Sequence, residues 1–174
     1  MTKKDFKSYG KWINTKTTGR CDVTPLFSEP KIFSDLIDDL IFPFKKDKID
    51  KIVAIDALGF VLGSAIALRL KKGLVLIRKG SKFPYKKSAL KSASFVDYTK
   101  SKKSFEIKKD SIKKGDGVLL VDEWIETGTQ IKTAVKLIEG LGGKIVGITT
   151  INADRNKKTE ILFNRYKLNS LKKR

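Results

Sequence analysis

The stretch Gly117-Val-Leu-Leu-Val-Asp-Glu-Trp-Ile-Glu-Thr-Gly-Thr-Gln130 contains the change of pattern that decides how this chain folds. Its four apolar residues run directly into two adjacent carboxylates, Asp122 and Glu123. A short polar loop with one glycine follows at 126–130, and apolar residues then recur at helical spacing over 131–141. The pattern predicts a buried strand, an acidic pair, a tight loop and a helix, in that order.

This order of elements is typical of a phosphate site. A loop that joins the carboxyl end of a parallel strand to a helix presents several backbone N–H groups and the positive end of the helix dipole. Carboxylates beside such a loop can hold ribose hydroxyls or a magnesium ion, which prefers oxygen ligands. The stretch therefore predicts a phosphate-binding loop with an acidic pair next to it.

The length and composition of the chain fit one domain. The sequence has 174 residues, of which 40% are hydrophobic, and this is enough to fill a core. We expect a single domain over 1–174. Within it we expect an N-terminal arm over 1–20, a flexible loop over 79–108 and a basic C-terminal tail over 152–174.

The residue types that are missing exclude several kinds of chemistry. The chain has no histidine, which excludes Ser-His-Asp and Cys-His mechanisms and most zinc sites. Cys21 is the single cysteine, so no intrachain disulfide can form. No apolar run is long enough to span a bilayer, and no apolar segment follows the charged N-terminus. We therefore expect a cytoplasmic protein with no membrane partner.

The formal net charge of +19 has three interpretations. It could serve nucleic-acid binding, it could serve a site for a small polyanion, or it could reflect a general lysine bias of the surface. The lysines are spread from Lys3 to Lys173 rather than gathered on one element, which favours the lysine bias. Binding of nucleic acid is therefore expected to be non-specific, if it occurs at all, although a positive field attracts any anionic substrate.

The rest of the chain alternates between runs typical of buried strands and runs typical of helices. We expect strands at 51–56, 74–77, 118–121 and 144–151, and helices at 34–41, 61–70 and 131–141. Ser34 is expected to cap the first helix, and a loop at 57–60 to precede the second. Asp22-Val-Thr-Pro25 is expected to form a short strand that ends in a turn. The alternation predicts an α/β fold with a Rossmann-like central parallel sheet flanked by helices.

The segment between Lys79 and Ser104 has a different character. It is polar and rich in lysine, and short alternating runs occur at 94–98 and 104–107. A β-hairpin flap with a mobile tip fits these runs better than a helix, and long loops in compact domains are usually lids or disordered. The tail from Asn152 onward is basic and only weakly patterned, so we predict no element there.

Residues 118–143 resemble the phosphoribosyl-diphosphate (PRPP) motif of type I phosphoribosyltransferases, most closely that of the adenine phosphoribosyltransferases. Four further motifs of the family find a counterpart in the same order. They are Asp22-Val-Thr-Pro25, Ile55-Asp-Ala-Leu-Gly-Phe-Val-Leu-Gly63, Leu76-Ile-Arg-Lys-Gly-Ser-Lys-Phe-Pro84 and Phe95-Val-Asp-Tyr98. Order and spacing agree from about residue 20 to residue 151.

The resemblance implies a fold and an activity. The fold would be that of type I phosphoribosyltransferases, a central parallel sheet with a flexible β-hairpin hood. The activity would be that of a glycosyltransferase in nucleotide salvage, moving the 5-phosphoribosyl group from PRPP to an adenine-like purine base and releasing pyrophosphate. Mg²⁺ would be bound through PRPP or pyrophosphate, and the protein would form a homodimer. The alternative is a catalytically weak protein of the same fold that senses PRPP or a nucleotide.

The resemblance also implies roles for individual residues. The 5′-phosphate would be cradled by Glu126, Thr127, Gly128, Thr129 and Gln130. Asp122 and Glu123 would bind the ribose hydroxyls, where carboxylates favour an oxocarbenium-like centre. The pyrophosphate leaving group would be held by Arg78, Lys79 and Lys82. Asp97 would handle the proton of the base with Tyr98 beside it, so that the catalytic set would be Asp97, Asp122 and Glu123.

The sequence departs from the family pattern at several of these positions. Glu123 stands where the family has a second aspartate, and the phosphate loop reads Glu-Thr-Gly-Thr-Gln instead of Ala-Thr-Gly-Gly-Thr. Leu58 replaces an arginine near the pyrophosphate, Asp97 shortens a glutamate, and Cys21 stands where an arginine near the base is expected. These departures weaken the expectation for the base more than the expectation for PRPP. Trp124 follows the acidic pair and either lines the pocket or packs in the core.

Overall fold

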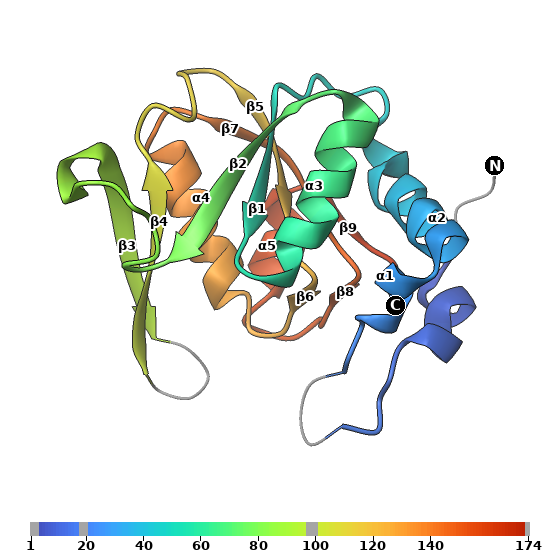
Figure 1. Ribbon diagram of the computed structural model, residues 1–174. Helices are drawn as coiled ribbons and strands as arrows, with labels where there is room; N and C mark the ends of the chain where they lie inside the picture. The colour runs from blue at the N-terminus through green and yellow to red at the C-terminus, as the bar shows by residue number, and fades with distance from the viewer. Residues whose placement is uncertain (1–3, 18–20, 97–100, 173–174) are drawn as a thin grey trace.

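The computed structural model describes residues 4–17, 21–96 and 101–172. Their centre is a seven-stranded sheet in the order β3-β4-β2-β1-β5-β7-β9 (Figure 1). Strands β1, β2, β5, β7 and β9 pair in parallel, and β3 and β4 add an antiparallel hairpin to β2. The strands are β1 (Lys51–Ile55), β2 (Gly73–Lys79), β3 (Leu90–Val96), β4 (Lys102–Lys108), β5 (Gly117–Val121), β7 (Lys144–Thr150) and β9 (Leu168–Ser170). A separate parallel pair is formed by β6 (Trp124–Ile125) and β8 (Asn152–Ala153).

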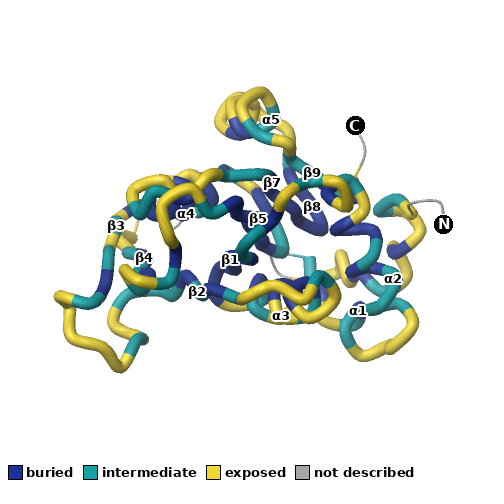
Figure 2. Tube along the Cα trace, turned by 90° about the horizontal axis from the view of Figure 1, so that it is seen from above, coloured by how far each residue is buried: buried dark blue, intermediate teal, exposed yellow. Residues whose placement is uncertain are grey.

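Helices cover both faces of the sheet, as the alternation predicts. Seen from above, α2 (Pro30–Ile41) and α3 (Leu58–Leu70) lie on one face and α4 (Thr129–Glu139) on the other (Figure 2). The short elements are η1 (Phe6–Trp12), α1 (Pro25–Ser28), η2 (Phe42–Phe44), η3 (Lys87–Ala89) and α5 (Glu160–Arg165). No helix in the described part of the chain is long and apolar enough to cross a membrane.

The apolar run of β5 divides its side chains between the two layers. Val118 and Leu120 belong to the core cluster on the side of α4, and Leu119 and Val121 belong to the cluster under α2 and α3. All four residues are fully buried. A strand with helices on both faces has no solvent side, and this explains why its sequence is continuously apolar instead of alternating.

Two helices begin earlier than the sequence pattern predicts. Helix α2 starts at Pro30 instead of being capped by Ser34, because proline is well suited to the first helical turn. The hydroxyl of Ser34 instead accepts a hydrogen bond from Arg69 of α3. Helix α3 starts at Leu58, so most of the loop expected at 57–60 is helical.

Two further expectations about local structure are corrected. Asp22 forms only an isolated bridge to Asn14, and Pro25 opens α1, so 22–25 is not a strand. The tail contains β8, α5 and β9, and β9 completes the sheet beside β7. Its strands have only two and three residues, which is too short for an alternating pattern to be visible in the sequence.

The expected hairpin is present. β3 and β4 pair from Leu90 with Lys108 to Val96 with Lys102. Phe95 and Phe105 turn toward α4 and stack with 4.7 Å between their ring centroids. Helix α4 thus lies between the main sheet and this hairpin, which we call the hood.

Candidate active site

A cavity of about 170 Å³ opens at the carboxyl ends of β1, β2 and β5. Its walls are the loop that follows β1, the end of β2, and the chain from Asp122 to Ile131. The carboxyl edge of a parallel sheet is where α/β folds place their ligands. The stretch that decides the fold therefore also forms most of this cavity.

The phosphate loop enters α4 through Gly128. This residue has φ +72° and forms the N-cap of the helix without any side-chain cap. A Cβ atom placed on it would lie 2.9 Å from Cδ1 of Leu162 in α5. Both the backbone conformation and the contact require glycine here. Because no side chain caps the helix, the N–H groups of its first turn remain available to an anion.

The other loop residues surround this helix end. The hydroxyl oxygens of Thr127 and Thr129 lie 3.1 Å apart, and the amide of Asn156 donates to the carbonyl of Glu126 at 2.8 Å. Glu126 is exposed to solvent, although it belongs to the cavity wall. Thr129 is the first residue of α4 and has no positive φ, so the threonine is tolerated where the family has glycine.

The acidic pair lies beside this loop. Asp122 is 4% exposed, and its carboxylate accepts the N–H of Glu123 at 2.9 Å. Glu123 is half-buried and also lines the cavity. A Cβ on Gly59 would lie 3.1 Å from the carbonyl of Val121 and 3.4 Å from the Asp122 carboxylate. The first turn of α3 therefore approaches the end of β5 closely, and this contact fixes the position of the acidic pair.

Asp56 is a third carboxylate in the cavity, and the sequence interpretation did not assign it a function. It ends β1, is 8% exposed, and accepts the N–H of Lys79 at 3.4 Å and the Nζ of Lys82 at 3.5 Å. The peptide bond that follows it is cis. The sequence signal for this residue was the same as for Asp122, a carboxylate directly after a buried parallel strand.

The three cations expected at the pyrophosphate occupy different places. Lys79 lines the cavity, and Lys82 reaches it through its ion pair with Asp56. Arg78 does not belong to the cavity wall: it donates to the carbonyl of Lys82 at 2.8 Å, and its guanidinium lies over the ring of Phe83. Consecutive side chains of a strand point to opposite faces, which explains why Arg78 and Lys79 separate.

The residues expected at the base are only partly visible. Asp97 and Tyr98 lie outside the described residues. Cys21 is half-buried and packs against the cluster under α2 and α3. Trp124 lines the cavity and packs as well: its indole N–H donates to Asp154 at 3.4 Å, and its ring meets Phe6 of η1 edge-on at 6.2 Å.

Comparisons with known proteins agree with this geometry. The family model described as "Phosphoribosyl transferase domain" matches residues 29–173. Adenine phosphoribosyltransferase of Roseobacter denitrificans is 42% identical over 130 residues, which cover 75% of this chain and 72% of that protein. The enzyme of Clostridium botulinum is 38% identical over 150 residues, covering 86% of this chain and 85% of that protein.

A solved structure shares the fold across almost its whole length. The crystal structure of adenine phosphoribosyltransferase from Thermoanaerobacter pseudethanolicus superposes with a TM-score of 0.85 at 28% identity, covering 97% of this chain and 99% of that chain. With the family model matching most of the chain, this protein belongs to the type I phosphoribosyltransferase family of pentosyl-transferring enzymes, where its relatives are adenine phosphoribosyltransferases.

Proposed function

We propose that this protein transfers the 5-phosphoribosyl group of PRPP to adenine, releasing pyrophosphate and forming a nucleoside monophosphate in purine salvage. One observation supports the proposal above all others. A single cavity joins the uncapped end of α4 to the carboxylates Asp122 and Glu123. A phosphate loop with an acidic pair beside it is what a ribose 5-phosphate requires.

The geometry suggests how the ribose phosphate is held. The 5′-phosphate would receive the N–H groups at the start of α4 and the hydroxyls of Thr127 and Thr129, with Gln130 as a further donor. Asp122 and Glu123 would accept the 2′- and 3′-hydroxyls and stabilise positive charge at the anomeric carbon. Because Asp122 is buried, its charge acts with little screening by water.

The pyrophosphate would lie on the opposite side of the cavity, toward β2. Lys79 and Lys82 would neutralise the charge that grows on this leaving group. Arg78 would act indirectly, because its contacts hold the loop that carries Lys82. Leu58 lines the cavity where the family pattern has a cation, so this chain relies on its two lysines there.

Mg²⁺ would enter together with PRPP. The described residues contain no group of three or more carboxylate or cysteine side chains that could hold a metal ion by themselves. Mg²⁺ commonly binds through one or two carboxylates plus substrate phosphates, and the cavity offers such carboxylates at Asp56, Asp122 and Glu123. When bound, the ion would supply charge neutralisation at the pyrophosphate. Asp97 and Tyr98 of the hood would face the base, and we keep a cytoplasmic homodimer as part of the proposal.

Turnover of PRPP with adenine, hypoxanthine and guanine tests this function. We expect adenine to be the preferred acceptor and Asp122→Asn to lower kcat about a hundredfold or more, which is typical for the loss of a charge-stabilising group. The replacement of the expected arginine by Leu58 favours one competitor, a PRPP sensor without catalysis. Binding of PRPP by the wild type without turnover of any base would establish the sensor instead.

A further inference from the structure

The net charge of this protein is concentrated in the hood, although the lysines themselves are widely spread. Residues 79–109 contain ten lysines and only two acidic residues, a net charge of +8. An even distribution of the total charge of +19 would place about 3 charges in these 31 of 174 residues. The excess arises mainly because acidic residues are nearly absent from this segment. A general lysine bias does not account for that absence.

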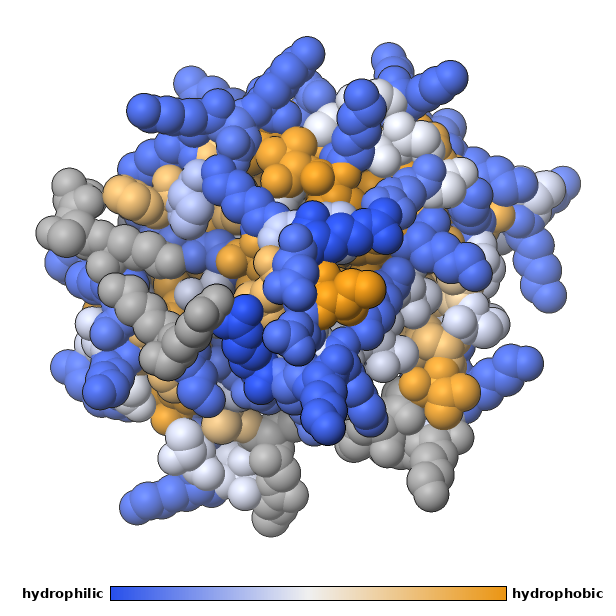
Figure 3. Space-filling model, turned by 180° about the vertical axis from the view of Figure 1, so that it is seen from behind, coloured by the Kyte–Doolittle hydropathy of each residue, from blue (hydrophilic) through white to orange (hydrophobic). Residues whose placement is uncertain are grey.

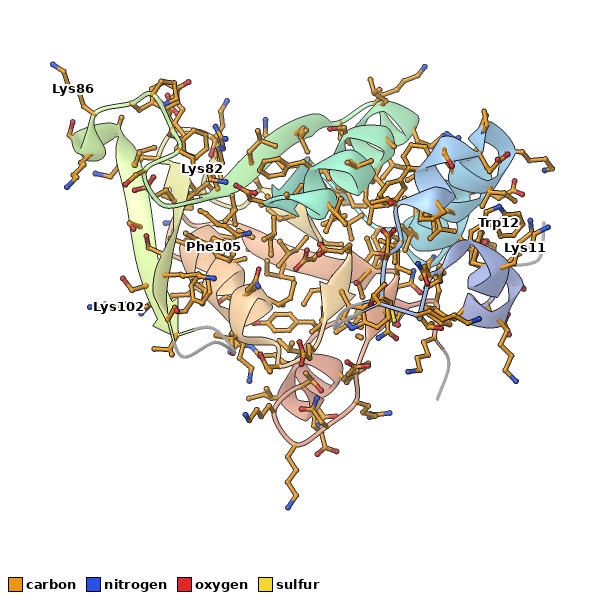
Figure 4. All side chains as sticks on the ribbon, turned by 60° about the horizontal axis from the view of Figure 1, so that its bottom comes forward. Lys11, Trp12, Lys82, Lys86, Lys102 and Phe105 are labelled. Carbon is orange, nitrogen blue, oxygen red and sulfur yellow. The ribbon has the colours of Figure 1, made fainter. Side chains whose placement is uncertain are left out.

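The hood presents this charge outward. Figure 4 shows Lys86 and Lys102 projecting into solvent from opposite ends of the hairpin, while Phe105 points into the protein. Lys86, Lys87, Lys102 and Lys109 are exposed and form no ion pair with any described residue. A seven-residue strand is about 23 Å long, so the two ends of this basic face are separated by the length of several nucleotides.

The same face has a concave part that can accept phosphate groups. A depression of about 480 Å³ is lined by Lys79, Lys102 and Lys103 together with Gly80 and the serines Ser81, Ser94 and Ser104. Gly80 approaches Ser104 so closely that a Cβ on it would overlap the serine hydroxyl. Ammonium and hydroxyl groups are the donors that contact nucleic-acid backbones most often.

An exposed aromatic ring accompanies the lysines. Tyr85 is 46% exposed, and the Nζ of Lys108 lies 5.5 Å from its ring centroid. Phe83 supports it from behind, with 5.8 Å between the two rings. Bases stack on such rings when they are not held in a duplex. An acidic peptide or a lipid surface would use the lysines but would have no use for this ring.

We propose that the outer face of the hood binds single-stranded nucleic acid without sequence preference. The lysines would contact the phosphates, and Tyr85 would stack against a base. This surface is separate from the phosphoribosyl site except at Lys79, which both cavities share. The proposal goes beyond the transferase activity and does not depend on it.

The test compares two variants that lose the same charge. The hood variant carries Lys86→Gln, Lys87→Gln, Lys102→Gln and Lys109→Gln. The control carries Lys16→Gln, Lys46→Gln, Lys144→Gln and Lys157→Gln, four exposed lysines outside the hood that form no ion pair with a described residue. Affinity for a fluorescent oligouridine is measured by anisotropy over a series of salt concentrations, and thermal unfolding checks that both variants are folded.

We expect the hood variant to bind at least tenfold more weakly than the control. Its log–log salt slope should fall by about 3, because each lost phosphate contact removes about 0.7 from the slope for single strands. Tyr85→Ser should weaken binding to the single strand roughly fivefold or more and leave binding to a duplex unchanged. Equal losses in both lysine variants, or binding to phosphatidylserine vesicles but not to the oligonucleotide, would overturn the proposal.

Discussion

The Oδ2 atom of Asp56 lies 3.5 Å from the Nζ of Lys82, and this ion pair joins the end of β1 to the loop that follows β2. The Asp56 side chain is only 6% exposed, whereas that of Lys82 is 49% exposed. The buried partner is therefore fixed and the exposed partner is positioned by it. This relationship assigns Asp56 a function in holding a cation at the pyrophosphate side of the cavity.

Asp56→Asn should raise KM for PRPP severalfold, because the neutral amide no longer holds Lys82 at the cavity. Lys82→Met should raise KM similarly, and the double variant should be little worse than either single one. The coupling should be about 0.5–1 kcal/mol, the range for a pair that is largely open to water on one side. Steady-state kinetics of the four proteins measure this value, and strictly additive effects would show that the two residues act independently.

Gly128→Ala should impair PRPP binding through the geometry of the phosphate loop. Alanine at φ +72° is strained, and its Cβ would meet Leu162 at 2.9 Å. We expect KM for PRPP to rise tenfold or more, together with a loss of about 1–2 kcal/mol in the free energy of unfolding.

Gly115→Ala is a matched control for this substitution. Gly115 has φ +89°, but a Cβ there would meet no atom within 4 Å. It should lose comparable stability in urea unfolding while KM for PRPP stays at the wild-type value. If both variants shifted KM equally, the effect would come from general destabilisation and not from the phosphate loop.

Much of this site follows from one run of sequence because its order is local. The change from an apolar run to an acidic pair, a glycine loop and a helical period lies within 117–141, and all of it is present in the structure. The long-range part was harder to predict. Asp56 and Trp124 become site residues only because separate strands end at the same edge of the sheet. No spacing in the sequence reveals which side chains meet there.

The errors in element boundaries have physical causes of the same kind. Helix α2 begins at Pro30 because its first turn needs no N–H donor from proline, a preference that outweighed the cap expected from Ser34. The strands of the tail were missed because β9 is held by its pairing with β7 and by Asn169, whose amide donates to the carbonyl of Leu40. Neither contact leaves a local pattern in the sequence.

Trp124→Leu should raise KM for adenine more than KM for PRPP. Trp124 is the one aromatic side chain among the described residues that line the cavity, and Phe6 and Asp154 hold it in place. An aromatic contact of about 0.5–1.5 kcal/mol corresponds to a two- to tenfold change in KM.

Trp12→Leu serves as the control for Trp124, because Trp12 is half-buried, lies under Lys11 and does not line the cavity. It should leave both KM values unchanged. An equal rise of the two KM values in Trp124→Leu would indicate that the tryptophan supports the whole cavity and has no special relation to the base.

Tyr9 anchors the N-terminal arm through a buried hydrogen bond, and its loss should be visible in the pH dependence of stability. Its hydroxyl donates to Asp39 at 2.5 Å, and the two residues are 1% and 7% exposed. Burial, followed by the hydrogen bond and the charge of Asp39, raises the pKa of Tyr9 above its ordinary value. Tyr9→Phe should cost about 1–3 kcal/mol at neutral pH, because the carboxylate of Asp39 loses a buried donor.

The sign of the pH effect follows from the raised pKa of Tyr9. The folded state keeps the tyrosine proton at pH values where the unfolded chain, with a pKa near 10, has lost it. The stabilisation is therefore fully present below about pH 10 and declines above it, by up to about 1.4 kcal/mol per pH unit. The difference in unfolding free energy between wild type and Tyr9→Phe should thus shrink between about pH 9 and about pH 11. Burial also raises the pKa of Tyr166, but this contribution is common to both proteins and cancels in the difference. Tyr85→Phe, at an exposed ring, should show no such trend, and a constant difference for Tyr9→Phe across this range would contradict the assigned hydrogen bond.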